Sequence, residues 1–71
     1  MNDIEITHFP VALFKVLQIA GLADSGGQAK WMIDDGQVQL NGMVERQKRK
    51  QCHCLDEVKL GDDVVRLVSR D

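Results

Sequence analysis

Apolar residues first alternate with polar ones along the chain and then change to a helical spacing. In the segment 2–7, Ile4 and Ile6 fall on one side of an extended backbone, which predicts a short strand. From Pro10 to Ala20, apolar residues recur every three or four positions, and Gly21 follows them. Because proline suits the first turn of a helix and glycine the position just past its end, the pattern predicts a first helix that starts at Pro10 and stops at Gly21.

A second helical pattern starts at Ser25. Gln28 follows three residues later, and a Ser with a Gln at this spacing is typical of a capping box, in which the two residues bond each other's backbone N–H groups. Ala29 and Ile33 share one face of this predicted helix. Gly36 is a good candidate for the left-handed residue after its last turn.

Beyond Gly36 the period becomes two, which predicts strands. Val38 and Leu40 point one way, and Asn41-Gly42 is the sequence that a two-residue type I′ hairpin turn requires. We expect the return strand to continue through the lysine- and arginine-rich run toward Cys54.

Two further strands, around 58–60 and 64–68, are predicted to be joined across 61–63. The fold class is therefore α+β, with two short helices packed on a small, mostly antiparallel curved sheet. The 71 residues suffice for a single domain, 1–71, without a large enclosed active site. The expected core consists of Leu13, Leu17, Ala29, Ile33, Val38, Leu40, Val58 and Val64.

Cellular location is inferred from what the sequence lacks. No segment approaches the roughly 20 apolar residues needed to cross a bilayer, and the acidic N-terminal segment does not resemble a signal peptide. Cys52 and Cys54 are too close together for an ordinary disulfide framework, which favours a reducing compartment. We expect a cytoplasmic protein that does not contact membranes.

Positive charge is concentrated in one short run, although the net charge is −2. Four of the nine basic residues lie within 46–50, whereas the other five are outnumbered by eleven acidic residues. Such segregation can turn one face of a small protein toward a polyanion, and it is equally typical of a solvated strand edge.

Cys52-His53-Cys54 raises the question of a metal site. In an extended strand His53 points away from both cysteines, and only His8 is available as a further ligand. We therefore expect both cysteines to pack on the inner face of the sheet, with no metal and no other cofactor. No nucleophile and base stand at a catalytic spacing, so no catalytic residue is predicted and the chain is interpreted as a non-enzyme.

Trp31 follows Lys30 but lies off the apolar stripe of the second helix. Its side chain could stack on an unpaired base, or it could be buried against a neighbouring element. Burial is the more frequent outcome for a lone tryptophan, and we expect it here.

The ordered motifs resemble a known family. The pattern runs Leu13-x-x-x-Leu17-x-x-x-Gly21-x-x-x-Ser25-Gly26-Gly27-x-Ala29-Lys30-x-x-Ile33-x-x-Gly36-x-Val38-x-Leu40-Asn41-Gly42, followed by Val58-x-x-Gly61-Asp62-x-Val64. It is similar to the S-four (S4) RNA-binding domain, or alpha-L motif, and especially to its small stand-alone bacterial members. Many relatives carry basic residues at the start of the first helix and directly after the capping Ser, where this chain has Val11-Ala12-Leu13-Phe14 and Gly26.

The resemblance implies a protein that binds structured RNA, such as rRNA or a tRNA-like RNA, through the helix pair and the hairpin. Its partner would then be RNA, free or within a ribosome or ribonucleoprotein, and we expect a monomer. The candidate RNA-binding residues are Lys30, Arg46, Lys48, Arg49, Lys50, Gly26, Gly27 and Gln28. Gly26 and Gly27 either permit a tight turn or offer backbone N–H groups to a phosphate.

Two other interpretations remain for the basic run. It could dock an acidic partner protein in an interaction module with little RNA affinity, or it could bind DNA weakly and without base specificity.

Overall fold

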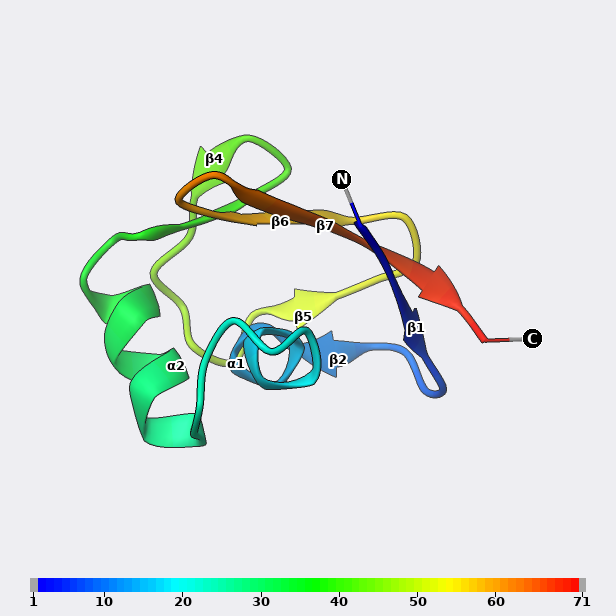
Figure 1. Cartoon of the computed structure of the whole chain (residues 1–71), viewed down its shortest axis with the longest axis horizontal. Helices are drawn as coiled ribbons and strands as arrows, with labels where there is room; N and C mark the ends of the chain where they lie inside the picture. The colour runs from blue at the N-terminus through cyan, green and yellow to red at the C-terminus, as the bar shows by residue number, and fades with distance from the viewer. Residues whose placement is uncertain (1, 71) are drawn as a thin grey trace.

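Two sheets and two helices make up the fold in the computed structural model, which describes residues 2–70. Figure 1 shows the five-stranded sheet as one layer, with the helices and a two-stranded sheet beneath it. In chain order the elements are β1 (Asn2–Ile6), β2 (Val11–Ala12), α1 (Leu13–Ile19), α2 (Gly26–Asp34), β3 (Val38–Leu40), β4 (Met43–Val44), β5 (Gln51–Cys52), β6 (Glu57–Leu60) and β7 (Asp63–Ser69). The arrangement confirms the predicted α+β class.

The larger sheet has the strand order β1-β7-β6-β3-β4. Only the β1–β7 pair is parallel; the other three pairs are antiparallel. Asn41 and Gly42 have φ values of 52° and 85°, as the predicted type I′ turn requires, and they join β3 to β4. Gly61-Asp62 joins β6 to β7 between the paired residues Leu60 and Asp63.

Both helices end in the same hydrogen-bonding pattern. At the end of α1 the Leu22 N–H donates to the Leu17 carbonyl oxygen (2.9 Å), and at the end of α2 the Gln37 N–H donates to the Met32 carbonyl oxygen (3.1 Å). These are Schellman motifs, which satisfy carbonyl groups that the helix itself leaves unpaired. The predicted helix ends at Gly21 and Gly36 are confirmed.

The predicted start of the first helix at Pro10 is wrong. Pro10 lies in the connection between β1 and β2, and its peptide bond with Phe9 is cis. Val11 and Ala12 are extended because they pair with β5, so α1 starts only at Leu13. A pairing with residues about forty positions away therefore overrides the local helical pattern.

The predicted return strand through the basic run is also wrong. β4 ends at Val44, and residues 45–50 form a loop before β5. We call residues 46–50 the basic loop. Only Gln51 and Cys52 resume an extended pairing, and they pair with β2 rather than with the large sheet.

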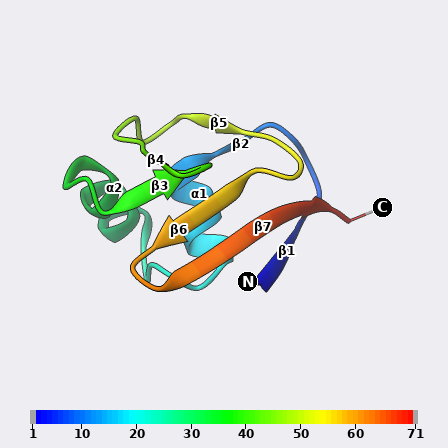
Figure 2. The ribbon, with the colours of Figure 1, turned by 90° about the horizontal axis from the view of Figure 1, so that it is seen from above.

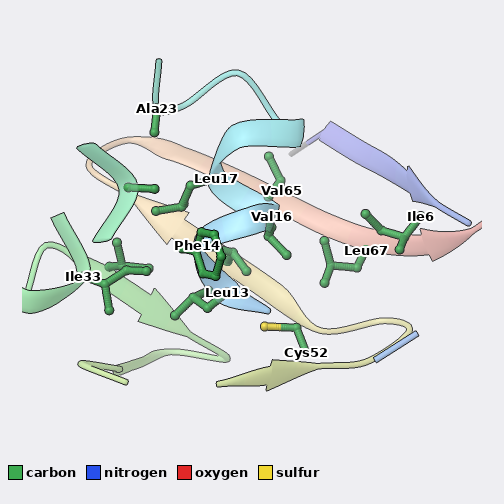
Figure 3. Close-up of a cluster of buried hydrophobic side chains, with 13 residues drawn as sticks. Ile6, Leu13, Phe14, Val16, Leu17, Ala23, Ile33, Cys52, Val65 and Leu67 are labelled. Atoms are coloured by element: carbon green, nitrogen blue, oxygen red, sulfur yellow. The ribbon is translucent and has the colours of Figure 1, made fainter. Parts of the chain in front are cut away.

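The core lies between the sheet and the two helices. In Figure 2, α1 lies beneath the middle of the sheet and α2 toward one end. Figure 3 shows Leu13, Phe14, Val16 and Leu17 of α1 meeting side chains from the sheet and from α2. The buried residues are Ile6, Leu13, Phe14, Val16, Leu17, Ala23, Ala29, Ile33, Val38, Cys52, Val58, Val65 and Leu67.

Six of the eight predicted core residues are fully buried, whereas Leu40 and Val64 are half-buried. Val65 stands opposite Val58 in the β6–β7 ladder, and residues opposite each other point to the same face. Because Val58 faces the helices, Val65 and Leu67 do so too, and Val64 belongs to the other face.

Candidate nucleic-acid interface

Three cationic side chains gather around one aromatic ring. Phe14, on α1, is only 8% exposed. The distances from its ring centroid are 4.7 Å to the Lys30 ammonium, 5.7 Å to the Lys15 ammonium and 5.5 Å to the Arg49 guanidinium carbon. We call Lys15, Lys30 and Arg49 the cation cluster. Its members come from α1, α2 and the basic loop, so the tertiary fold creates it.

The ring and the cations have complementary electrostatics. The face of an aromatic ring carries partial negative charge, and each such contact contributes about 0.5–1 kcal/mol at an exposed site. The ion pairs found within residues 2–70 are Lys48–Asp34 and Arg66–Asp3, and neither involves the cation cluster. Three positive charges are thus held together without a carboxylate to neutralise them, which is an arrangement that suits an anionic ligand.

The backbone of the basic loop is bonded to the start of α1. The Leu13 N–H donates to the Lys50 carbonyl oxygen (2.9 Å), and the Phe14 N–H donates to the Lys48 carbonyl oxygen (3.1 Å). Ala12, the N-cap residue, has no side chain that could accept these bonds, so the loop carbonyls cap the helix instead. The same two bonds hold Arg49, the residue between the two carbonyls, beside Phe14.

Arg46 and Lys48 contact the C-terminal end of α2 rather than Phe14. Arg46 Nη1 donates to the Asp34 carbonyl oxygen at 3.2 Å, and Lys48 Nζ lies 2.9 Å from Asp34 Oδ2. Cations are favourable at this end of a helix because its carbonyl groups are partially negative. Lys50 is exposed.

The N-terminal end of α2 has the predicted cap with one difference. The Gln28 N–H donates to Ser25 Oγ (3.1 Å), while Gln28 Oε1 accepts from the N–H of Asp24 (2.5 Å) rather than from that of Ser25. The Gln28 side chain is therefore engaged in the cap. Gly26 and Gly27 lie one turn before Lys30 and Trp31, and no hydrogen bond among the described residues engages their N–H groups.

Trp31 is 61% exposed, so the expected burial of its side chain is wrong. It lies on the face of α2 opposite the buried Ala29 and Ile33. Lys15 is missing from the candidate residues predicted from the sequence, and Phe14 was named there only as part of the segment 11–14. The available signal was the Phe14-Lys15 pair at the start of the first helix, the place where related domains carry basic residues.

The Cys-His-Cys segment is only partly as predicted. Cys52 is buried, but Cys54 is exposed because the chain leaves β5 after Cys52. Burial raises the pKa of the Cys52 thiol to about 12, and the Asp56 and Glu45 carboxylates act in the same direction. No group of three or more His, Cys, Asp or Glu side chains within 2–70 is arranged to hold a metal ion.

A surface groove of about 510 Å³ lies between the end of β1 and α1, with His8, Pro10, Val11, Lys15 and Ile19 among its lining residues. Lys15 thus borders both this groove and the cation cluster. Among the described residues, neither helix is long and apolar enough to cross a membrane.

Comparison with known proteins gives consistent matches. YbcJ of Escherichia coli, which carries the name "Putative RNA-binding protein", and YbcJ of Shigella flexneri are each 45% identical to this chain over 42 residues, 59% of the chain. The match spans 60% of the length of these curated relatives.

The solution structure of YbcJ from E. coli, described as revealing an alfaL motif involved in RNA-binding, superimposes with a TM-score of 0.74 at 33% identity. That superposition covers 96% of this chain and 87% of the other. The family model of the S4 domain matches residues 4–68. Sequence motifs, fold and comparisons agree, and the chain belongs to the S4 domain family.

Proposed function

We propose that this protein binds structured RNA, without catalysing a reaction, through the cation cluster and the exposed parts of the basic loop. The observation that carries the proposal is the convergence of Lys15, Lys30 and Arg49 on the Phe14 ring with no carboxylate paired to them in the described chain. Membership of the S4 domain family and the similarity to YbcJ support RNA as the polyanion.

The candidate residues divide into two roles. Lys30, Arg49 and Lys15 contact phosphates directly, together with the exposed Lys50. The planar guanidinium of Arg49 can bond two phosphate oxygens at once, whereas the lysines act as point charges. Arg46 holds the basic loop against α2 through its hydrogen bond to the Asp34 carbonyl oxygen, which keeps Arg49 in position, and Lys48 is paired with the Asp34 carboxylate.

Recognition in this arrangement depends on the spacing of phosphates. Side chains cannot easily read bases in the deep major groove of an RNA helix, so double-stranded RNA is recognised mostly through its shape, its phosphates and its 2′-hydroxyls. A fixed group of three cations suits such a spacing. The acidic remainder of the chain repels polyanions from the other faces and orients the approach.

A salt titration with matched variants tests the proposal. The probes are a tRNA, a helical rRNA fragment and a DNA duplex of the same length as the rRNA helix. With about four phosphate contacts, the log of the RNA affinity should fall with the log of the salt concentration with a slope of about −3 to −4, and losing two contacts should reduce the magnitude of that slope by about two.

The variant pair is Lys30→Gln with Arg49→Gln, and the control pair is Lys59→Gln with Arg70→Gln. Lys59 and Arg70 are exposed and lie outside the proposed interface, and the two pairs change the net charge equally. Equal weakening by both pairs would mean that binding is general charge attraction. Failure of the wild-type protein to bind either RNA would favour docking to an acidic protein instead.

A further inference from the structure

Most of the Trp31 side chain lies outside the core of the fold. It is 61% exposed, on the side of α2 opposite the buried Ala29 and Ile33. No hydrogen bond or ring contact among the described residues engages its indole. Isolated exposed apolar residues are common on protein surfaces, so what matters here is the position of this one.

Trp31 directly follows the cluster residue Lys30. The Lys30 ammonium lies 4.7 Å from the Phe14 ring centroid, and Lys30 as a whole is half-buried. Successive side chains on a helix are turned by about 100° from each other. The Trp31 side chain therefore leaves the helix one residue after Lys30, turned by about 100° toward the exposed side of α2.

We propose that Trp31 stacks on an unpaired base of the RNA whose phosphates are held by the cation cluster. This inference rests on the proposed function and narrows its ligand to RNA in which a bulge, loop or overhang adjoins a helix. Inside a helix both faces of a base are covered by its neighbours, whereas an unpaired base offers a free face to an aromatic side chain. Stacking of this kind tolerates every base.

The acidic residues near Trp31 determine how the strand approaches. Asp34 and Asp35 lie three and four positions after Trp31, on the same exposed side of α2. Asp34 is paired with Lys48, but Asp35 has no cationic partner in the described chain and repels phosphates. The unpaired nucleotide therefore reaches the indole from the N-terminal half of α2, where Gly27 leaves the surface open.

The composition of the chain makes this proposal easy to test. Trp31 is the only tryptophan and there is no tyrosine, so intrinsic fluorescence reports on this residue alone. The two probes are a blunt RNA duplex of about 16 base pairs, the length that a small double-stranded RNA-binding domain spans, and the same duplex with a short bulge. We expect the bulged RNA to quench the fluorescence and the fully paired duplex to leave it almost unchanged.

Substitutions separate stacking from electrostatic binding. Trp31→Ala should weaken binding of the bulged RNA by about ten-fold and leave the affinity for the paired duplex unchanged, while Trp31→Phe should retain most of the affinity. Leu55→Ala is the control, because Leu55 is 66% exposed in the connection between β5 and β6 and lies outside the proposed contact. It should change neither affinity.

Each of the other outcomes is decisive. Equal binding of both RNAs by the wild-type protein and by Trp31→Ala, without quenching, would overturn the stacking proposal and leave RNA binding intact. A change in self-association on Trp31→Ala with unchanged RNA affinities would identify the face as a protein contact and also overturn it. If the wild-type protein bound neither RNA, the proposed function itself would fail.

Discussion

The guanidinium group of Arg46 occupies the space that a side chain at Gly36 would need. A Cβ atom at residue 36 would lie 2.6 Å from Arg46 Nη2, and the φ of Gly36 is +81°. The glycine at the end of α2 therefore serves two purposes: it adopts the left-handed backbone of the helix end and gives Arg46 access to the Asp34 carbonyl oxygen.

Gly36→Ala should destabilise the domain more than Gly21→Ala does. Gly21 occupies the equivalent position after α1 with a φ of +75°, but nothing lies within 4 Å of its Cβ site. Both substitutions strain the backbone, by about 1 kcal/mol or more. Only Gly36→Ala also displaces Arg46, and loss of its hydrogen bond to Asp34 should add about 1 kcal/mol. Urea unfolding measures the difference.

A double variant tests the cause of that difference. Once Gly36→Ala has displaced the guanidinium, Arg46→Ala should have little further effect on the free energy of unfolding. If the two losses added fully, Arg46 would not be responsible.

Arg46→Ala and Arg49→Ala should act on different properties. Arg46 donates a hydrogen bond to the end of α2, so its removal should lower stability by about 1 kcal/mol. RNA affinity should fall only through the looser position of the basic loop. Arg49 is exposed over Phe14, so its removal should weaken RNA binding directly and lower stability by about 0.5 kcal/mol, the lower end for an exposed contact between a cation and a ring. Thermal unfolding and RNA titration of both proteins would reveal the separation. Similar losses of RNA affinity at unchanged stability would contradict it.

Asp34→Asn should strengthen RNA binding. The Asp34 carboxylate lies 2.9 Å from the Lys48 ammonium, and both side chains are partly exposed. Pairs of this kind contribute little to stability, about 0–1 kcal/mol, but here the carboxylate neutralises an ammonium group that could otherwise bind a phosphate. Freeing Lys48 should steepen the salt dependence of RNA binding by up to about one unit of slope.

Asp62→Asn is the matched control for that substitution. It removes the same charge from an exposed residue in the turn between β6 and β7, outside the proposed interface. An equal gain in affinity from both variants would attribute the effect to net charge rather than to Lys48.

Stability should fall with increasing pH above about 9, in part because of Cys52. Burial, reinforced by Asp56 and Glu45, raises the pKa of this thiol from 9.0 to about 12. Between these values the unfolded chain has lost the proton that the folded chain keeps, so deprotonation favours unfolding. The contribution of the thiol is complete below pH 9 and is lost as the pH rises toward 12.

Cys52→Ala should flatten this pH dependence, whereas Cys54→Ser should preserve it because Cys54 is exposed. Urea unfolding of the three proteins at pH 8 and at about pH 10.5, which lies between the two pKa values, provides the comparison. The same slope in Cys52→Ala as in the wild type would assign the pH dependence to other groups.

The locally determined features of the fold could be predicted from the sequence. The Asn41-Gly42 turn, the Ser25 cap and the glycines after each helix depend on a few adjacent residues, and all of them have the predicted conformation. The face that β7 presents to the core could not be predicted in this way. Apolar residues at 64, 65, 67 and 68 fit either face, and the pairing of Val65 with Val58 decides between them.

The candidate site was only partly predictable, again because contacts between distant segments determine it. The basic run marked the location, but the sequence does not indicate that its backbone carbonyls would cap α1, or that Arg49 would meet Lys30 over Phe14. Those contacts join three separate segments of the chain. They follow from the tertiary fold, so no local pattern records them.

The parallel pairing of β1 with β7 has a consequence for the order of folding. Asn2 is paired with Val65 and Ile6 with Ser69, so this ladder connects residues more than sixty positions apart. Closing so large a loop costs entropy that no local contact offsets, and we expect β1 to join the sheet last. Until then β7 is an unpaired edge with apolar residues along it, able to recruit a strand from another molecule. The exposed ion pair between Asp3 and Arg66, opposite each other in this ladder, adds a weak attraction to the strand that covers this edge in the folded domain.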